Sequence, residues 1–448
     1  FIRLRDQILR AAPEAKFHTY ASVHDSHAVL GAELAFGQRA RSVVKYDLAK
    51  VVVSVDCDFL GDETNLVRNQ RSFAKTRAIE SPSGEMSRLY VVEAGHSVTG
   101  ANADHRLRLP ASQAGEYLKA LAKTLAGQGV DLSAVAGSLG NGQVAGVPAE
   151  WLSEVAKDLV ANRGKSVVVV GRRQPAAVHA LAYAINAALG NLGTTVQLFP
   201  AVDPSEGDVV ASLKQLVDEI QQVETLVILG GNPVYDAPAD LAFAQALGRQ
   251  GLTTVHLSSR VNETSALCSW HCPEAHELEA WGDQKAVDGT VSIQQPLIAP
   301  LWHARSAIEL LAMAAGVRAW RGYNVVRSTT RQTSLSQGLF ERDWRKVLHR
   351  GVVDGTTAVA LADLALNGAA VAGALAQVAA PVAVSAQAME VQFVADPKLF
   401  DGRHANNPWL LELPDPMTKV VWENVAIVSP KTAKDLGLKS GDMVEVTR

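Results

Sequence analysis

Cysteine is scarce in this chain of 448 residues, which contains only Cys57, Cys268 and Cys272. Three cysteines cannot form a disulfide framework, and by themselves they cannot hold a four-cysteine iron–sulfur cluster. His271 and His276 lie close to Cys268 and Cys272, but structural zinc sites usually draw their ligands from two separate pairs. Small buried thiols are therefore the favoured interpretation, and no metal site is predicted from these residues.

The chain also lacks long apolar runs and a strong excess of charge. No run of about 18 apolar residues occurs, so no membrane span is predicted. The net charge of −4 argues against a general binder of nucleic acid or of anionic membranes. No signal peptide is visible, and there is no Walker A, G-x-S-x-G or H-E-x-x-H motif.

What the chain does have is a repeated alternation of β-branched runs with helical patterns. Apolar runs typical of buried strands occur at residues 51–55, 89–93, 166–170, 195–199, 226–229 and 253–257, and residues 105–110 have the pattern of an edge strand. Helical patterns lie at residues 115–127, 151–162, 175–189 and 208–221. Strands that alternate with helices indicate βαβ units. The sequence thus predicts an α/β fold of two doubly wound, mostly parallel-sheet domains.

The same pattern predicts where the domains begin and end. A short helix and linker occupy residues 1–14, a first α/β domain residues 15–135, and a second α/β domain residues 150–400. A glycine-rich link joins the two domains, and further strands are predicted at residues 357–361 and 382–384. From residue 418 the pattern changes to alternating β segments, so residues 418–448 are predicted to begin a β-rich, barrel-like domain.

A glycine turn follows one of the predicted strands directly. The apolar residues 226–229 run into Gly230, Gly231, Asn232 and Pro233, and residues 237–248 are predicted to form a helix. Open α/β sheets hold their ligands at the carboxyl ends of the strands. Glycines at this position allow a ligand to approach the backbone, although an ordinary strand-to-helix turn has the same composition.

The order of these segments resembles that of the molybdopterin oxidoreductase superfamily. The matching segments are residues 51–58, 91–93, 103–110, 230–233, 262–266 and 276–283. The C-terminal segments 401–410, 412–419, 422–424 and 429–433 resemble the large iron–sulfur subunits of alternative complex III, a quinol:cytochrome c oxidoreductase. This resemblance covers nearly the whole chain.

The resemblance implies candidate residues for a cofactor. Family members bind two pterin–guanine dinucleotides, which implies that Gly230, Gly231 and Asn232 face one dinucleotide and that Glu93 faces the other. A side chain near the start of the first domain holds the metal in the family. The matching stretch, residues 21–31, has no cysteine but offers Asp25, Ser22 and Ser26 as oxygen ligands. Capping of a helix by Asp25 or Ser26 is the simpler interpretation.

Two further departures from the family pattern bear on the cofactor. Asp56, Cys57, Asp58 and Phe59 stand where the family has a small polar turn, and two carboxylates there repel phosphate. The arginine that often follows the acid in the family is absent after Glu93. We therefore expect a module without its own cofactor and without catalytic residues. The alternative is an active domain with a molybdenum bis-pterin guanine dinucleotide and Asp25 or a serine on the metal.

The resemblance also implies partners and a location. It implies the other subunits of a membrane-bound respiratory complex, iron–sulfur clusters in a C-terminal part beyond this sequence, and a place on the periplasmic side of the inner membrane. Two further groups of residues each have two possible interpretations. Arg172 and Arg173 suit phosphate or ion pairs, and Trp270, Trp281 and Trp302 suit a quinone or subunit contact or the packing of a core.

Overall fold

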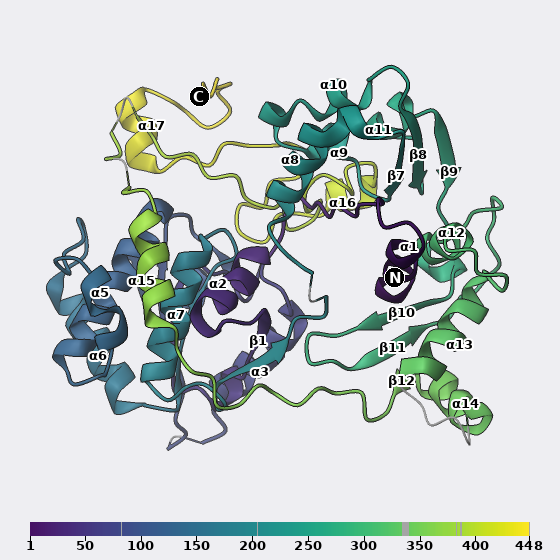
Figure 1. Cartoon of the computed structure of the whole chain (residues 1–448). Coiled ribbons are helices and arrows are strands. Elements are labelled where there is room, and N and C mark those ends of the chain that lie inside the picture. Colours follow the sequence, from purple (N-terminus) through teal and green to yellow (C-terminus); the bar gives the residue numbers. More distant parts are fainter. Residues whose placement is uncertain (82, 204, 334–339, 382, 386–387, 448) are drawn as a thin grey trace. The chain divides into compact units, whose positions relative to one another are not determined.

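The computed structural model describes residues 1–447 except 82, 204, 334–339, 382 and 386–387. It divides the chain into two compact units, each built from two separated segments (Figure 1). Unit 1 comprises Phe1–Val44 and Val196–Ala365, and unit 2 comprises Lys45–Thr195 and Leu366–Arg448. The sequence predicts consecutive domains instead, because a local pattern does not show which distant segment completes a fold.

Unit 2 is built around a four-stranded, fully parallel sheet with the strand order β4–β3–β2–β5. The strands are β2 (Val51–Val55), β3 (Arg88–Glu93), β4 (His105–Arg108) and β5 (Ser166–Val170). The helices are α3 (Leu66–Arg77), α4 (Val98–Ala101), α5 (Ala114–Gly127), α6 (Ala149–Ala161), α7 (Ala176–Ala188), α15 (Gly368–Gln377), α16 (Pro408–Glu412) and α17 (Pro430–Leu436).

The central strand of this sheet, β2, is buried along its whole length. It consists of valines and Ser54, because a strand covered on both faces of a parallel sheet has no polar side. The Ser54 hydroxyl donates to the carbonyl oxygen of Cys57 at 2.6 Å, so the single polar side chain of the strand is satisfied. Buried leucines of α5 and α6 and the small residues of α7 complete the core.

Unit 1 holds three smaller sheets. One is the parallel sheet of β7 (Thr225–Leu229), β8 (Thr253–Ser258) and β9 (Trp270–Pro273). The antiparallel sheets pair β1 (Ala40–Val44) with β6 (Val196–Pro200), and β10 (Gly282–Lys285) with β11 (Val291–Gln294) and β12 (Val352–Val353). The helices are α1 (Ile2–Ala11), α2 (Ser26–Phe36), α8 (Val209–Glu219), α9 (Pro233–Asp236), α10 (Phe243–Leu247), α11 (Glu263–Leu267), α12 (Ala307–Ala314), α13 (Gly322–Thr333) and α14 (Phe340–Arg350).

Several apolar clusters hold unit 1 together. One joins the buried side chains of Leu213 and Leu216 on α8 to Phe243 and Leu247 on α10. A second centres on Trp344 of α14, and a third packs α1 against α12 and α13. Burial of such side chains is the main stabilising contribution to a fold of this kind.

The structure confirms the predicted mixed α/β class, and the principal predicted strands and helices are present. The expected helix at residues 237–248 is present only in part, as α10 (Phe243–Leu247), because Pro238 lies near its start and Ala242 interrupts it with a left-handed conformation at φ 48°. Residues 357–361 form no strand, and Val382 of the predicted strand 382–384 lies outside the described residues. The described part of residues 418–448 holds helix α17 and no strand.

None of the helices in the described part of the chain has the length and apolarity needed to cross a membrane. The longest is α5, which is amphipathic and packs within unit 2.

The turn after β5 gives a first testable prediction. A Cβ atom on Gly171 would lie 1.7 Å from the carbonyl oxygen of Asp56, because the ends of β2 and β5 approach closely. Gly171→Ala should lower the free energy of unfolding by about 3 kcal/mol or more, since the displaced atom is backbone. Urea denaturation followed by circular dichroism measures this effect. Gly127→Ala is the control, because nothing lies within 4 Å of its added methyl group. Equal loss in both variants would contradict the close approach.

Candidate functional site

The carboxyl ends of three parallel strands meet at one edge of the sheet in unit 2. The register pairs Val55 with Val92 on β3 and with Val170 on β5. The residues that follow these positions, Asp56, Glu93 and Gly171, therefore lie at the same edge. This is the place at which an open parallel sheet presents its ligand-binding turns.

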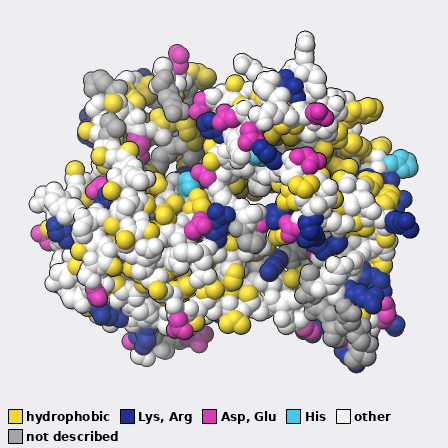
Figure 2. Space-filling model, viewed as in Figure 1, with side chains coloured by type: hydrophobic (Ala, Val, Ile, Leu, Met, Phe, Trp, Pro, Cys, Tyr) yellow, Lys and Arg dark blue, Asp and Glu magenta, His cyan; other side chains and the backbone are white. Residues whose placement is uncertain are grey.

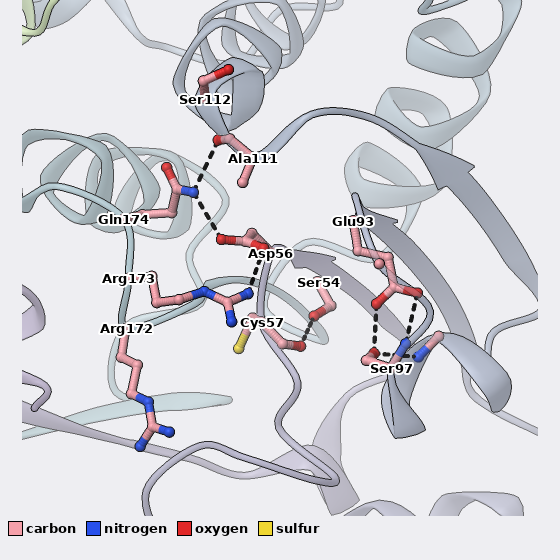
Figure 3. Close-up of polar contacts among 12 residues, drawn as sticks. Ser54, Asp56, Cys57, Glu93, Ser97, Ala111, Ser112, Arg172, Arg173 and Gln174 are labelled. Carbon is pink, nitrogen blue, oxygen red and sulfur yellow. Dashed lines mark hydrogen bonds and ion pairs between the residues drawn. The ribbon is translucent and has the colours of Figure 1, made fainter. Parts of the chain in front are cut away.

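Asp56 is buried at this edge and is fully paired. It adopts a left-handed conformation with φ 48°. One oxygen of its carboxylate accepts from Nη2 of Arg173 at 2.9 Å, and the other accepts from Nε2 of Gln174 at 2.9 Å (Figure 3). Gln174 also donates to the carbonyl oxygen of Ala111 at 3.0 Å. The ion-paired interpretation of Arg173 is therefore confirmed, with a partner that is buried rather than exposed.

Glu93 is also buried and is held by residues of the same unit. Its carboxylate accepts from the amide of Ser97 at 3.3 Å and from the Ser97 hydroxyl at 2.5 Å (Figure 3). Nε of Arg106 on β4 donates to it at 2.6 Å. An arginine thus pairs with Glu93, but it comes from the neighbouring strand rather than from the residues after the acid.

Backbone amides near this edge are occupied by the chain's own acceptors. Asp58 accepts from the amide and the hydroxyl of Thr99, at 2.8 and 2.6 Å. The Thr99 hydroxyl oxygen accepts from the amide of Leu60 at 3.0 Å, and the Ser97 hydroxyl oxygen accepts from the amide of Gly100 at 2.9 Å. The amides of residues 61–63 donate to the carbonyl oxygen of Asp58. These donors are therefore not free for a phosphate group.

Arg172 brings two further carboxylates to the edge. Its amide donates to Oε1 of Glu63 at 3.0 Å, and its guanidinium pairs with Asp62 at 2.5 Å and lies over the ring of Phe400. Burial raises the pKa of Glu63 to about 7, because ionisation inside the protein loses hydration. Burial and the neighbouring carboxylates Glu63 and Asp58 also raise the pKa of the Cys57 thiol, so this thiol is unreactive.

The predicted glycine turn of unit 1 lies at the end of β7. Gly230 and Gly231 have φ 70° and 72°, which explains the choice of glycine at both positions. Oδ1 of Asn232 accepts from the amide and the hydroxyl of Thr264 at 3.1 and 2.8 Å, and Nδ2 donates to Glu263 at 2.7 Å. Asn232 therefore ties the turn to the start of α11.

A buried histidine supports this turn from β8. Nε2 of His256 lies 3.2 Å from the carbonyl oxygen of Gly231, and Nδ1 lies 2.8 Å from the hydroxyl of Ser265. Burial lowers the pKa of His256, so the neutral ring donates from Nε2 and accepts at Nδ1. No acceptor in the described residues pairs with the amides of Gly231 and Asn232, and Gly231 is exposed. The turn is thus rigid and open.

The candidate metal ligands near the start of the chain already have partners. Asp25 is the residue before α2 and makes no capping bond; it shares Arg41 with Glu206 in an ion-pair network. The Ser26 hydroxyl lies 2.7 Å from Nδ1 of His24, and Ser22 is half-buried. The structure describes no group of three or more His, Cys, Asp or Glu side chains that could hold a metal ion.

The cysteine and histidine cluster and the tryptophans are also placed. Cys268 and Cys272 are free and half-buried, and His276 uses Nδ1 to cap the amide of Leu278. Trp281 packs against a core cluster, but Trp270 and Trp302 are largely exposed. Core packing is therefore confirmed for Trp281 alone.

The predicted residues fall into two groups that belong to different units. Glu93 lies in unit 2, whereas Asp25, Ser22, Ser26 and the Gly230–Asn232 turn lie in unit 1. The sequence predicts that Asp56 repels phosphate. It does not predict which side chains pair with the acids at this edge of the sheet. Gln174, Thr99 and Arg106 carry no motif, and only the folded sheet brings them to the acids.

The chain has a mixed α/β fold that is consistent with the molybdopterin oxidoreductase type. Among solved structures, the chain is similar to acetylene hydratase from Pelobacter acetylenicus, with a TM-score of 0.51 and 13% sequence identity. The likeness covers 66% of this chain and 51% of that chain, so the chain spans about half the length of the structure that it matches. No protein-family model and no curated protein matches the sequence.

Protonation of Glu63 gives a prediction about pH. Because its pKa is raised from 4.5 to about 7, the folded state keeps a proton that the unfolded state releases in this window. The free energy of unfolding therefore falls as the pH rises towards 7, because the unfolded state releases the proton of Glu63 first. Above that pH both states have lost the proton, and the loss stays constant. Relative to the parent, Glu63→Gln should have a free energy of unfolding that increases by up to about 3 kcal/mol between about pH 5 and pH 8. Urea denaturation measures this difference. Exposed Glu80→Gln is the control, and a parallel gain there would contradict the assignment.

The Asn232 bonds give a prediction about the glycine turn. Asn232→Ala leaves the amide and hydroxyl of Thr264 without their acceptor, so stability should fall by about 1–3 kcal/mol. Thermal unfolding measures the loss. Asn324→Ala, which changes an exposed asparagine of α13 in the same unit, should leave the melting temperature nearly unchanged. A matching loss in both variants would count against the bridging role of Asn232.

Proposed function

We propose that this chain is the molybdopterin-oxidoreductase-like module of a respiratory quinol:electron-acceptor oxidoreductase complex, and that it is a structural part with no pterin cofactor of its own. The observation that carries the proposal is the edge of the β4–β3–β2–β5 sheet. Its carboxylates have partners from the same unit, and they take amides that a phosphate would use.

The residues at this edge do not fit a dinucleotide. A phosphate group needs free N–H donors and a positive or neutral surrounding. Here Asp56, Asp58 and Glu93 supply negative charge, and Arg173 and Arg106 are paired with carboxylates. A dinucleotide would have to break these ion pairs before it could form hydrogen bonds with the same groups. Breaking a buried ion pair is unfavourable because it leaves an unpaired buried charge.

The candidate metal ligands support the same proposal. Asp25 would have to leave Arg41 before its carboxylate reached a metal, and Ser26 is buried against His24. We infer that electrons in such a complex pass through iron–sulfur clusters held outside this sequence. The chain then offers surfaces to the other subunits, on the periplasmic side of the inner membrane, as the family resemblance implies.

A second candidate function is that of an active molybdenum or tungsten domain with a bis-pterin guanine dinucleotide. The observation in its favour is the open turn of unit 1, where Gly231 and Asn232 have amides without an acceptor among the described residues. This turn meets one requirement of a phosphate site, but the described edge of the β4–β3–β2–β5 sheet offers no matching one.

Metal analysis separates the two candidates. The chain is purified from a host that makes the pterin cofactor and is analysed for molybdenum, tungsten, iron and zinc by mass spectrometry. We expect far less than one molybdenum or tungsten atom per chain and no pterin fluorescence after denaturation. One atom per chain would overturn the structural proposal and favour the active domain. Acetylene hydratase prepared in the same way is a suitable comparison for metal recovery.

Association with a complex is tested separately. A tagged chain expressed in its native cells should co-purify with other subunits from detergent-extracted membranes, together with quinol oxidation activity. Recovery of the chain alone, under conditions that keep known respiratory complexes intact, would contradict the proposed partners.

A further inference from the structure

Unit 1 exposes five large apolar side chains at one place. Four lie in the loop between β11 and α12: Leu297, Ile298, Leu301 and Trp302, whose exposed fractions range from 51% to 78%. The fifth is Leu278, which is 49% exposed and whose carbonyl oxygen accepts from the amides of Leu297 and Ile298 at 2.8 and 3.3 Å. We name these five residues the apolar loop patch. Patches of this kind mark binding surfaces in soluble proteins.

The backbone beneath the patch holds these side chains outward. The amide of Leu301 donates to Oε1 of Glu279 at 3.2 Å. Nε2 of Gln294 donates to the carbonyl oxygens of Glu277 and Ala280 at 2.8 and 3.1 Å. These bonds anchor the start and the middle of the loop, so the apolar side chains are exposed on a hydrogen-bonded backbone.

Three arginines follow this loop along the chain, and two of them lie over one tryptophan ring. Arg305 follows the loop, and its guanidinium lies 5.6 Å from the centre of the Trp320 ring. The guanidinium of Arg321 lies 4.2 Å from the same ring, and exposed Arg318 is part of the same turn. Within the described residues, none of these three arginines forms an ion pair with a carboxylate.

Arginines and glutamates both lie near the patch, but the three arginines form no ion pair with these glutamates within the described residues. The net charge of −4 argues against general binding to anionic membranes, but Arg305 and Arg321 lie over the ring of Trp320, which carries no opposite charge, and Arg318 is exposed. Glu279 is engaged with the amides of Leu301 and His276. Figure 2 shows hydrophobic and basic side chains next to one another in the region where α12 and α13 lie in Figure 1.

We propose that the apolar loop patch and the arginines 305, 318 and 321 bind the surface of a bilayer that contains anionic lipids. Leucine and tryptophan side chains enter the boundary between headgroups and acyl chains, and arginines pair with lipid phosphates. A loop with outward apolar side chains, which contains Pro296 and Pro300, suits insertion into lipid better than it suits the flat core of a protein interface. The inference rests on the proposed function, because it makes the membrane a direct partner of a subunit of a respiratory complex.

Vesicle sedimentation tests this proposal with the whole chain. The parent should bind vesicles of phosphatidylcholine with phosphatidylglycerol, bind pure phosphatidylcholine vesicles more weakly, and be released from the anionic vesicles by salt. Leu301→Ser with Trp302→Ser should weaken binding about tenfold or more, because two inserted side chains are lost. Val261→Ser is the matched control, since Val261 is 71% exposed and lies outside the patch.

The arginines are tested by a second pair of variants. Arg318→Gln with Arg321→Gln should weaken binding to the anionic vesicles by about tenfold or more, because each arginine near an anionic surface contributes roughly fivefold to the affinity. Arg10→Gln with Arg260→Gln removes two exposed arginines elsewhere in unit 1 and should have little effect. Unchanged melting temperatures in all variants exclude loss of folding as the cause.

Three results would overturn the proposal. They are no binding of the parent to anionic vesicles, equal binding of patch and control variants, or capture of a protein subunit by a cross-linker at position 302 without vesicle binding. The last result would make the patch a protein interface. None of them depends on metal content, so failure of this proposal is distinguishable from failure of the proposed structural role.

Discussion

A buried carboxylate is stable only with a hydrogen-bonding partner, and this requirement organises the functional edge of unit 2. Asp56 and Glu93 stand at the ends of neighbouring parallel strands, where they would destabilise the sheet if they were left alone. Arg173 and Arg106 supply the opposite charges, and Gly171 allows the strand ends to approach each other. The edge that would bind a ligand in an open sheet is therefore used for the stability of the unit itself.

The two strand-end turns differ in the direction of their polar groups. In unit 2 the acids turn inward and bind the amides of their own loops. In unit 1 Asn232 binds Thr264 and so fixes the turn, and Gly231 stays exposed. The same architecture thus produces a closed edge and an open one. The difference lies in which side chains follow the strands rather than in the fold.

The parallel strands were predictable because their residues are local and uniformly apolar, as residues 51–55 show. Strand β1 was not, because it is partly polar and its antiparallel partner β6 lies about 150 residues away. Strand β10 was not, because its sequence Gly-Asp-Gln-Lys has no apolar pattern, although its partner β11 follows closely along the chain. At the site, the acids and glycines are visible in the sequence because of their type and place. Gln174 and Thr99 could not be predicted, since nothing in their local pattern shows that the sheet brings them to Asp56 and Asp58.

The division of each unit into two segments has a consequence for biosynthesis. Among the described strands, β1 pairs with β6, and the whole segment Lys45–Thr195 is made between them. On the ribosome, the sheet of unit 2 has all four of its strands before β1 meets its partner. Strand β1 must therefore wait as an unpaired edge, a state in which chaperones bind and aggregation begins. A shortened chain that ends at residue 195 would never leave that state.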